Sequence, residues 1–236
     1  MDATPHLTAL ALATLAGSSI PLGAWMATWS INILPDWRAT ELRHGIIAFG
    51  AGALLAAVAL VLLPEGAARL SPFASVGWFV LGGLGFAVID GALARRGSNS
   101  AQFLAMMMDY LPEALALGAL VTGNLSAAVL VAALIALQNL PESFNAMREM
   151  RESGRAASLW LFVLMVPLGP LAAYLGLSIP PSYEPVVGAI MVVASGGIVY
   201  LMFQDIAPQI PLEKTILPPL GAVLGFGLGF AGHLMI

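Results

Sequence analysis

Eight apolar stretches, each long enough to cross a membrane, fill nearly the whole chain. A helix needs roughly 20 predominantly apolar residues to cross the hydrocarbon core of a bilayer. The composition agrees, because 59% of the 236 residues are hydrophobic and 9% are charged, which is far from the soluble average. We therefore expect an all-α integral membrane protein, with residues 1–236 forming a single polytopic domain of eight transmembrane helices. The stretches lie at 7–29, 44–63, 73–94, 102–123, 126–147, 157–177, 185–207 and 215–236.

The residues before the first stretch include Asp2 and no Lys or Arg. A cleaved signal peptide begins with a basic segment, so we expect the first helix to be retained. Cysteine is absent, which excludes disulfides and thiolate metal ligands.

Basic residues are distributed unequally between the two sides of the predicted bundle. The connections after the second, fourth and sixth stretches contain only Arg69, and those after the first, third, fifth and seventh contain the other eight. By the positive-inside rule, both termini are expected outside the cytoplasm, in a multi-pass protein of the cell (inner) membrane. The eight residues are spread over four loops, which does not indicate a nucleic-acid surface. They are Arg38, Arg43, Arg95, Arg96, Arg148, Arg151, Arg155 and Lys214.

One polar pattern occurs twice, as DYLPE at 109–113 and QNLPE at 138–142. Each copy places two oxygen-bearing side chains four residues apart, on one face of a helix. An ionised carboxylate at mid-membrane costs about 2.5–3.5 kcal/mol on insertion scales, and no Lys or Arg lies at that depth. Protons or a metal ion must therefore neutralise these groups.

The two copies are predicted to face each other in a hairpin that turns near residues 124–126. Counted outward from that turn, Asp109 comes level with Glu142, and Glu113 with Gln138, to within about one helical turn. Pro112 and Pro141 each lack an N–H, so the carbonyls four residues earlier, at Met108 and Leu137, are freed beside the donors. A lone buried Glu is often protonated and hydrogen-bonded to a neighbour, but two motifs at matched depth favour an ion site.

The motifs resemble the ZIP family of divalent-metal transporters, whose fourth and fifth helices carry His-Asn-x-Pro-Glu-Gly-type sequences. DYLPEA (109–114) and QNLPES (138–143) occupy those places. Three further segments are similar to the family's second, sixth and seventh helices, so the resemblance spans most of the chain. These are AFGAGALLAAVALVLLPEG (48–66), VPLGPLAAYLG (166–176) and GGIVYLMFQDIAP (196–208).

The resemblance implies a main metal site of Asp109, Glu113, Gln138 and Glu142. Asn139 is the remaining ligand of a second site that many members have, so a single-ion site is expected here. Asp109 and Gln138 stand where the family usually has histidine. Tyr110 stands where the family often has asparagine, and Val166 stands where it often has glutamate.

An all-oxygen site bears on selectivity. Carboxylate and amide oxygens suit Mn²⁺, Mg²⁺ and Ca²⁺, imidazole suits Zn²⁺, and Fe²⁺ lies between. Carboxylates also bind zinc. We expect a broad or Mn²⁺/Fe²⁺-tolerant transporter.

Other polar residues have less specific interpretations. Asp205, with Gln204, lies near the predicted cytoplasmic end of its helix, and the resemblance implies an exit route there; a solvated helix end is the alternative. Asp90 is expected to hydrogen-bond to a neighbouring helix. Glu65 either attracts cations at the outer entrance or is solvated. His44 and His233 are expected to be packed or interfacial.

The sequence therefore predicts a transporter of divalent cations of the Zn/Mn/Fe type, with no cofactor and no enzymatic activity. The resemblance implies transport into the cytoplasm, a mobile bundle that shifts against a scaffold, and a homodimer. Two alternatives stay open. One is an intramembrane metal-dependent hydrolase, although such sites usually rest on two or three histidines. The other is a proton-coupled carrier of a non-metal substrate.

Overall fold

The computed structural model describes residues 4–30, 36–94, 101–152, 158–210 and 215–235, and this part of the chain contains helices and no strand. The all-α expectation is thereby confirmed. The α-helices are α1 (Thr4–Gly17), α2 (Ser19–Ser30), α3 (Asp36–Ala57), α4 (Leu63–Ala67), α5 (Pro72–Ala94), α6 (Ala101–Leu120), α7 (Leu125–Glu152), α8 (Leu159–Met165), α9 (Leu168–Leu177), α10 (Glu184–Leu201) and α11 (Leu217–Leu234).

Seven segments of the described chain are long and apolar enough to cross a membrane. They correspond to seven of the eight predicted stretches, so this is a multi-pass membrane protein. The remaining stretch, 102–123, forms α6, which packs against α7, α9 and α10. Its crossing of the membrane stays a prediction.

Several predicted helices are interrupted in ways that their hydropathy did not indicate. The first stretch divides at Ser18 into α1 and α2, and the sixth divides at residues 166–167, before α9. Two π-helical turns, η1 (Val58–Leu62) and η3 (Met202–Ile206), each end shortly before a proline, Pro64 and Pro208. Proline lacks the N–H that would continue the α-helical ladder, and π turns of this kind are frequent at functional sites.

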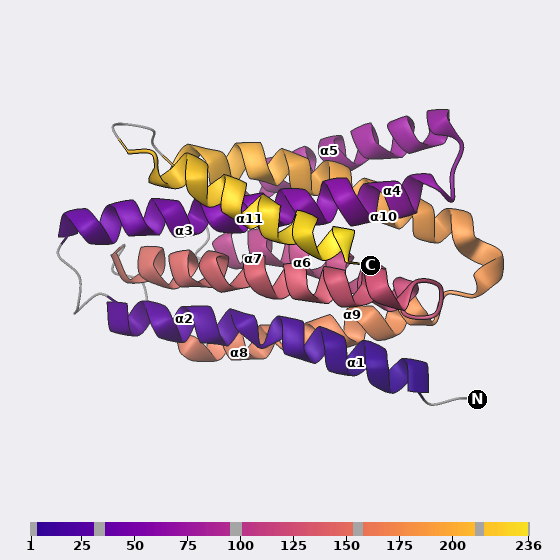
Figure 1. The fold of residues 1–236 in the computed structure, drawn as a ribbon, viewed down its shortest axis with the longest axis horizontal. Coiled ribbons are helices and arrows are strands. Elements are labelled where there is room, and N and C mark those ends of the chain that lie inside the picture. Colours follow the sequence, from indigo (N-terminus) through magenta and orange to yellow (C-terminus); the bar gives the residue numbers. More distant parts are fainter. Residues whose placement is uncertain (1–3, 31–35, 95–100, 153–157, 211–214, 236) are drawn as a thin grey trace.

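The helices form two sets that lie side by side (Figure 1). In the first set, α3 packs on α11, and α10 packs on α4 and α5. In the second, α7 packs on α1, α2 and α6, while α9 packs on α1 and α6. The sets meet where α3 contacts α7 and where α10 contacts α6. Both ends of the chain lie at the same end of the bundle (Figure 1).

Helices within each set approach closely at glycines. A Cβ atom on Gly118 of α6 would overlap the Ala173 carbonyl oxygen of α9, and one on Gly225 of α11 would overlap that of Phe49 in α3. In a bilayer, helix association depends on such close packing, because lipid tails are as apolar as the side chains. Gly225 therefore lies on the face of α11 that packs against α3.

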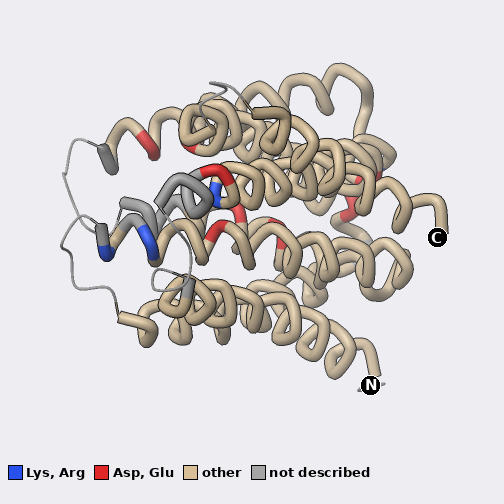
Figure 2. The backbone as a smooth tube through the Cα atoms, turned by 60° about the vertical axis from the view of Figure 1, so that its left-hand side comes forward, with Lys and Arg blue, Asp and Glu red and all other residues tan. Residues whose placement is uncertain are grey.

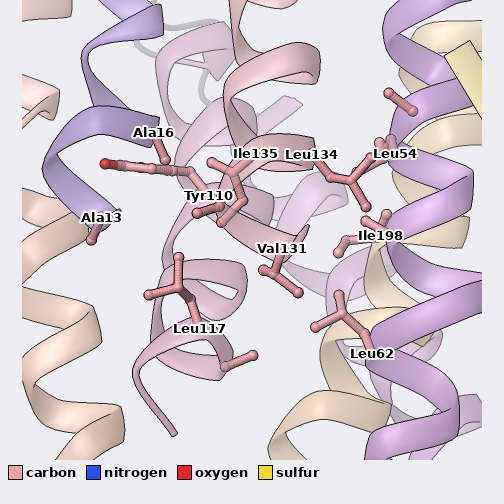
Figure 3. Packing of buried hydrophobic residues seen from close by; sticks show 14 of the residues in the cluster. Ala13, Ala16, Leu54, Leu62, Tyr110, Leu117, Val131, Leu134, Ile135 and Ile198 are labelled. Atoms are coloured by element: carbon pink, nitrogen blue, oxygen red, sulfur yellow. The ribbon is translucent and has the colours of Figure 1, made fainter. Parts of the chain in front are cut away.

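The buried core lies along α7 (Figure 3). Val131, Leu134 and Ile135 are nearly inaccessible, and they face Leu54 of α3 on one side and Tyr110 of α6 on the other. This apolar layer holds the two helix sets together and positions the polar residues that follow it along α7.

Candidate functional site

The α6 copy of the motif is buried. Asp109 is 3% exposed and Glu113 is fully buried. The helix α6 continues through Pro112, which lies between them. An oxygen of Asp109 accepts a hydrogen bond from the backbone N–H of Tyr110 at 3.1 Å. Figure 2 shows acidic (red) segments in the interior of the bundle, with a basic (blue) segment beside one of them in this view.

The α7 copy is brought opposite by a tight turn. The side-chain oxygen of Asn124 accepts the backbone N–H of Ala127 at 3.1 Å, which caps the first turn of α7. Further along, the amide nitrogen of Gln138 donates a hydrogen bond to Oε2 of Glu113. The predicted pairing of Glu113 with Gln138 at one level is therefore confirmed.

Three polar atoms beside this bond are buried without a hydrogen-bond partner. They are Oε1 of Glu113, Oε1 of Gln138 and Nδ2 of Asn139. Burying a polar group without a partner costs free energy, so each such group in a native protein needs a reason, such as stored strain, a functional role, or a bound water or ion. The orphaned oxygens belong to two hydrogen-bonded neighbours, Glu113 and Gln138, and a cation bound between the two helices after rotation of the Gln138 amide would satisfy both.

Glu142 differs from its counterpart Glu113, because it is half-buried rather than enclosed. Its carboxylate lies within electrostatic range of Asp109, Glu113 and Asp205. Four acidic side chains therefore repel one another across α6, α7 and η3. A cation placed among them would relieve this repulsion.

No three His, Asp or Glu side chains are arranged to hold a metal ion within the described part of the chain. The carboxylates interact over a longer range, and one oxygen of Glu113 is occupied by the amide of Gln138. An amide nitrogen does not ligate a hard cation, so Gln138 must turn its oxygen towards Glu113 before both can bind one ion. The convergence of Asp109, Glu113, Gln138 and Glu142 on one ion stays a prediction.

Close packing fixes both motif helices. Pro141 fits against Gly50 of α3, and the Leu140 carbonyl lies where a Cβ on Gly23 of α2 would be. On α6, Tyr110 points away from the motif acids, and its hydroxyl occupies the space beside Gly17 and Gly169. Tyr110 is thus a packing residue.

The predicted exit and entrance residues take part in separate polar groups. Asp205 and Gln204 lie in η3, with Asp205 half-buried and Gln204 exposed. Asp90 accepts a hydrogen bond from the Tyr200 hydroxyl at 3.0 Å, which confirms the expected bond to a neighbouring helix. Glu65 forms an ion pair with Arg69 at 2.9 Å and accepts the Asn124 amide at 2.8 Å.

One polar chain was not predicted. Arg43 of α3 donates to the Asn145 oxygen of α7 at 2.6 Å, and the Asn145 amide donates to Gln209 at 2.5 Å. Asn145 lies three residues after Glu142, so this hydrogen-bond network links the end of the α7 motif to α3 and to the segment that follows η3. The only sign of this network in the sequence was an amide residue, Asn145, shortly after the motif.

The predicted basic residues Arg95, Arg96, Arg155 and Lys214 lie outside the described residues, as does Asp2. Comparison with protein-family models finds no match, and comparison with curated proteins finds none either. The functional interpretation therefore rests on the residues of this chain and their geometry.

Proposed function

We propose that this protein transports divalent metal cations across the membrane through a site between α6 and α7. The observation that carries the proposal is the buried pair of Glu113 and Gln138, which keeps two oxygens without partners among mutually repelling carboxylates. A cation supplies both the missing partners and the missing positive charge. The resemblance to the ZIP family points to the same residues.

The ligands are Asp109, Glu113, Gln138 and Glu142, with Asn139 beside them. Rotation of the Gln138 amide exchanges its bond to Glu113 for an oxygen that faces the ion. Glu142, which is half-buried, provides the accessible side of the site. Such a set of oxygens suits Mn²⁺ and Fe²⁺ and also accepts Zn²⁺.

The arrangement of the helices suits a carrier. The site lies in the helix set built from α1, α2, α6, α7, α8 and α9, close to the contact of α7 with α3. Movement of this set against the set of α3, α5, α10 and α11 would expose Glu142 to one side and then to the other. Asp205 and Gln204 in η3, which continues α10, belong to the other set and line the exit.

The orientation follows from charge. The basic connections lie in the cytoplasm and both termini lie outside, in agreement with their common end of the bundle (Figure 1). In this orientation the protein lies in the cell (inner) membrane and moves its metal into the cytoplasm. It acts as a homodimer, uses no cofactor and catalyses no reaction.

The test is uptake by proteoliposomes that enclose a metal-sensitive dye, at fixed pH, with Mn²⁺, Zn²⁺ or Fe²⁺ outside. We expect saturable accumulation that protein-free liposomes lack. A pH dye in parallel vesicles identifies a proton-coupled carrier of another substrate. If proton movement occurs with no metal accumulation, or if no metal enters at any pH, the proposal is wrong.

A further inference from the structure

An apolar groove runs along the second contact between the two helix sets. It encloses about 870 Å³ between α5 and α10 on one wall and α6 and α9 on the other. Trp78, Leu175 and Val186 form its outer edge and are exposed, whereas Ala172 and Ala194 at its base are buried. Every side chain that lines it is apolar.

The groove covers one half of the membrane. It begins at Leu70, Leu175 and Pro185, which lie beside the connections at the end of the bundle where the chain termini are found. Along α10 it runs from Pro185 to Ala194, a rise of about 13 Å. One leaflet contributes roughly half of the 30 Å hydrocarbon core, so the groove has the depth of one leaflet.

We propose that this groove binds an acyl chain of a membrane phospholipid. Ordered water does not fill it, because a bound water needs two or more polar partners and the lining is almost entirely apolar. The groove opens sideways from helices that cross the membrane, so the adjacent medium is hydrocarbon. Its depth matches an acyl chain that enters from the leaflet at the terminal end.

The bound chain lies against the candidate site. Leu111 and Pro112 line the inner part of the groove, next to Glu113, which faces the bundle interior. The chain therefore fills the seam between the helix sets on the side of α6 and α10. Recognition is by shape and apolar contact, so it does not depend on the lipid headgroup.

The test is lipid retention by the purified protein in detergent, measured by native mass spectrometry. Ala189 lines the groove, and Ala189→Phe places a ring in it. Ala231→Phe is the matched control, because Ala231 is exposed on α11 outside the groove. We expect wild type and Ala231→Phe to retain phospholipids with different headgroups, and Ala189→Phe to lose this species. Equal retention in both variants would overturn the proposal, as would retention of one headgroup class alone.

Tryptophan quenching gives a second readout that does not depend on Ala189→Phe folding normally. A phospholipid brominated on its acyl chain, added to the protein in detergent, should quench Trp78. The quenched fraction should be lost in Trp78→Phe. Unchanged quenching in Trp78→Phe would contradict an acyl chain in this groove. A shift from dimer to monomer in Ala189→Phe with unchanged lipid binding would instead identify a second copy of the chain as the occupant, and the lipid proposal would be wrong.

Discussion

The two copies of the motif have the same spacing but different environments. Glu113 on α6 is fully buried and accepts a hydrogen bond from Gln138, whereas Glu142 on α7 is half-buried and is surrounded by acidic groups. The difference arises because α6 is enclosed by α7, α9 and α10, while the end of α7 is hydrogen-bonded to Gln209 of the short η4 helix (Ala207–Gln209). An identical Leu-Pro-Glu sequence thus places one glutamate in a fully buried position and the other in a half-buried one.

The largest expected effect is the loss of transport when either glutamate is removed. Glu113→Ala and Glu142→Ala should each reduce metal uptake to the background of empty liposomes, because no neighbouring group replaces the lost carboxylate. The two variants should differ in stability. Glu113→Ala leaves the buried Gln138 amide without its acceptor, which costs about 1–3 kcal/mol, whereas Glu142→Ala should melt near the wild-type temperature.

Uptake and thermal unfolding in detergent measure the two effects separately. Glu113→Gln is the control for shape, because its side-chain oxygen still accepts from Gln138 while the charge is gone. It should be stable and inactive. Full uptake in the Glu113→Ala/Glu142→Ala double variant would refute the metal site.

An intermediate effect is expected from introducing histidine at the two positions where the ZIP family, which the motifs resemble, usually has it. Asp109→His/Gln138→His replaces oxygen donors with nitrogen and removes one negative charge, which favours Zn²⁺ over Mn²⁺. Competition uptake with both ions present should show a raised zinc-to-manganese ratio. An unchanged ratio would mean that neither residue contacts the ion, and the site would then comprise Glu113, Glu142 and Asn139.

The smallest effect is expected at Asp205, whose charge acts on Glu142 from η3. Asp205→Asn should lower the uptake rate by a few-fold and leave equilibrium metal affinity almost unchanged, because the proposed function assigns Asp205 to the exit and not to the ligands. Glu184→Gln, an acidic residue at the start of α10, is the matched control and should have no effect. A loss of affinity equal to that of Glu142→Ala would place Asp205 among the ligands.

The sequence was sufficient to predict where the apolar spans lie and one contact of the site, but not where the helices are interrupted. Hydropathy located the spans to within a few residues, as for α7, predicted at 126–147 and observed at Leu125–Glu152. Counting from the turn paired Glu113 with Gln138, since the rise per residue of a helix is fixed.

Other features depend on tertiary structure and were not predictable. The π turns before Pro64 and Pro208 reflect how the chain adapts to a missing N–H, which composition does not specify. The orientation of the Gln138 amide depends on its neighbours in the folded site, so the sequence could not show that its nitrogen faces Glu113. The bond between Arg43 and Asn145 joins residues 102 positions apart, beyond any local pattern.

The most direct test of the central claim is the number of Mn²⁺ ions bound by purified protein, measured by electron paramagnetic resonance titration. We predict one ion per chain in the wild type and none in Glu113→Gln/Glu142→Gln, with both proteins folded and monodisperse. The Glu184→Gln variant should retain the single ion. Equal Mn²⁺ binding by the wild type and the double variant would contradict the assignment of the two Leu-Pro-Glu glutamates as metal ligands.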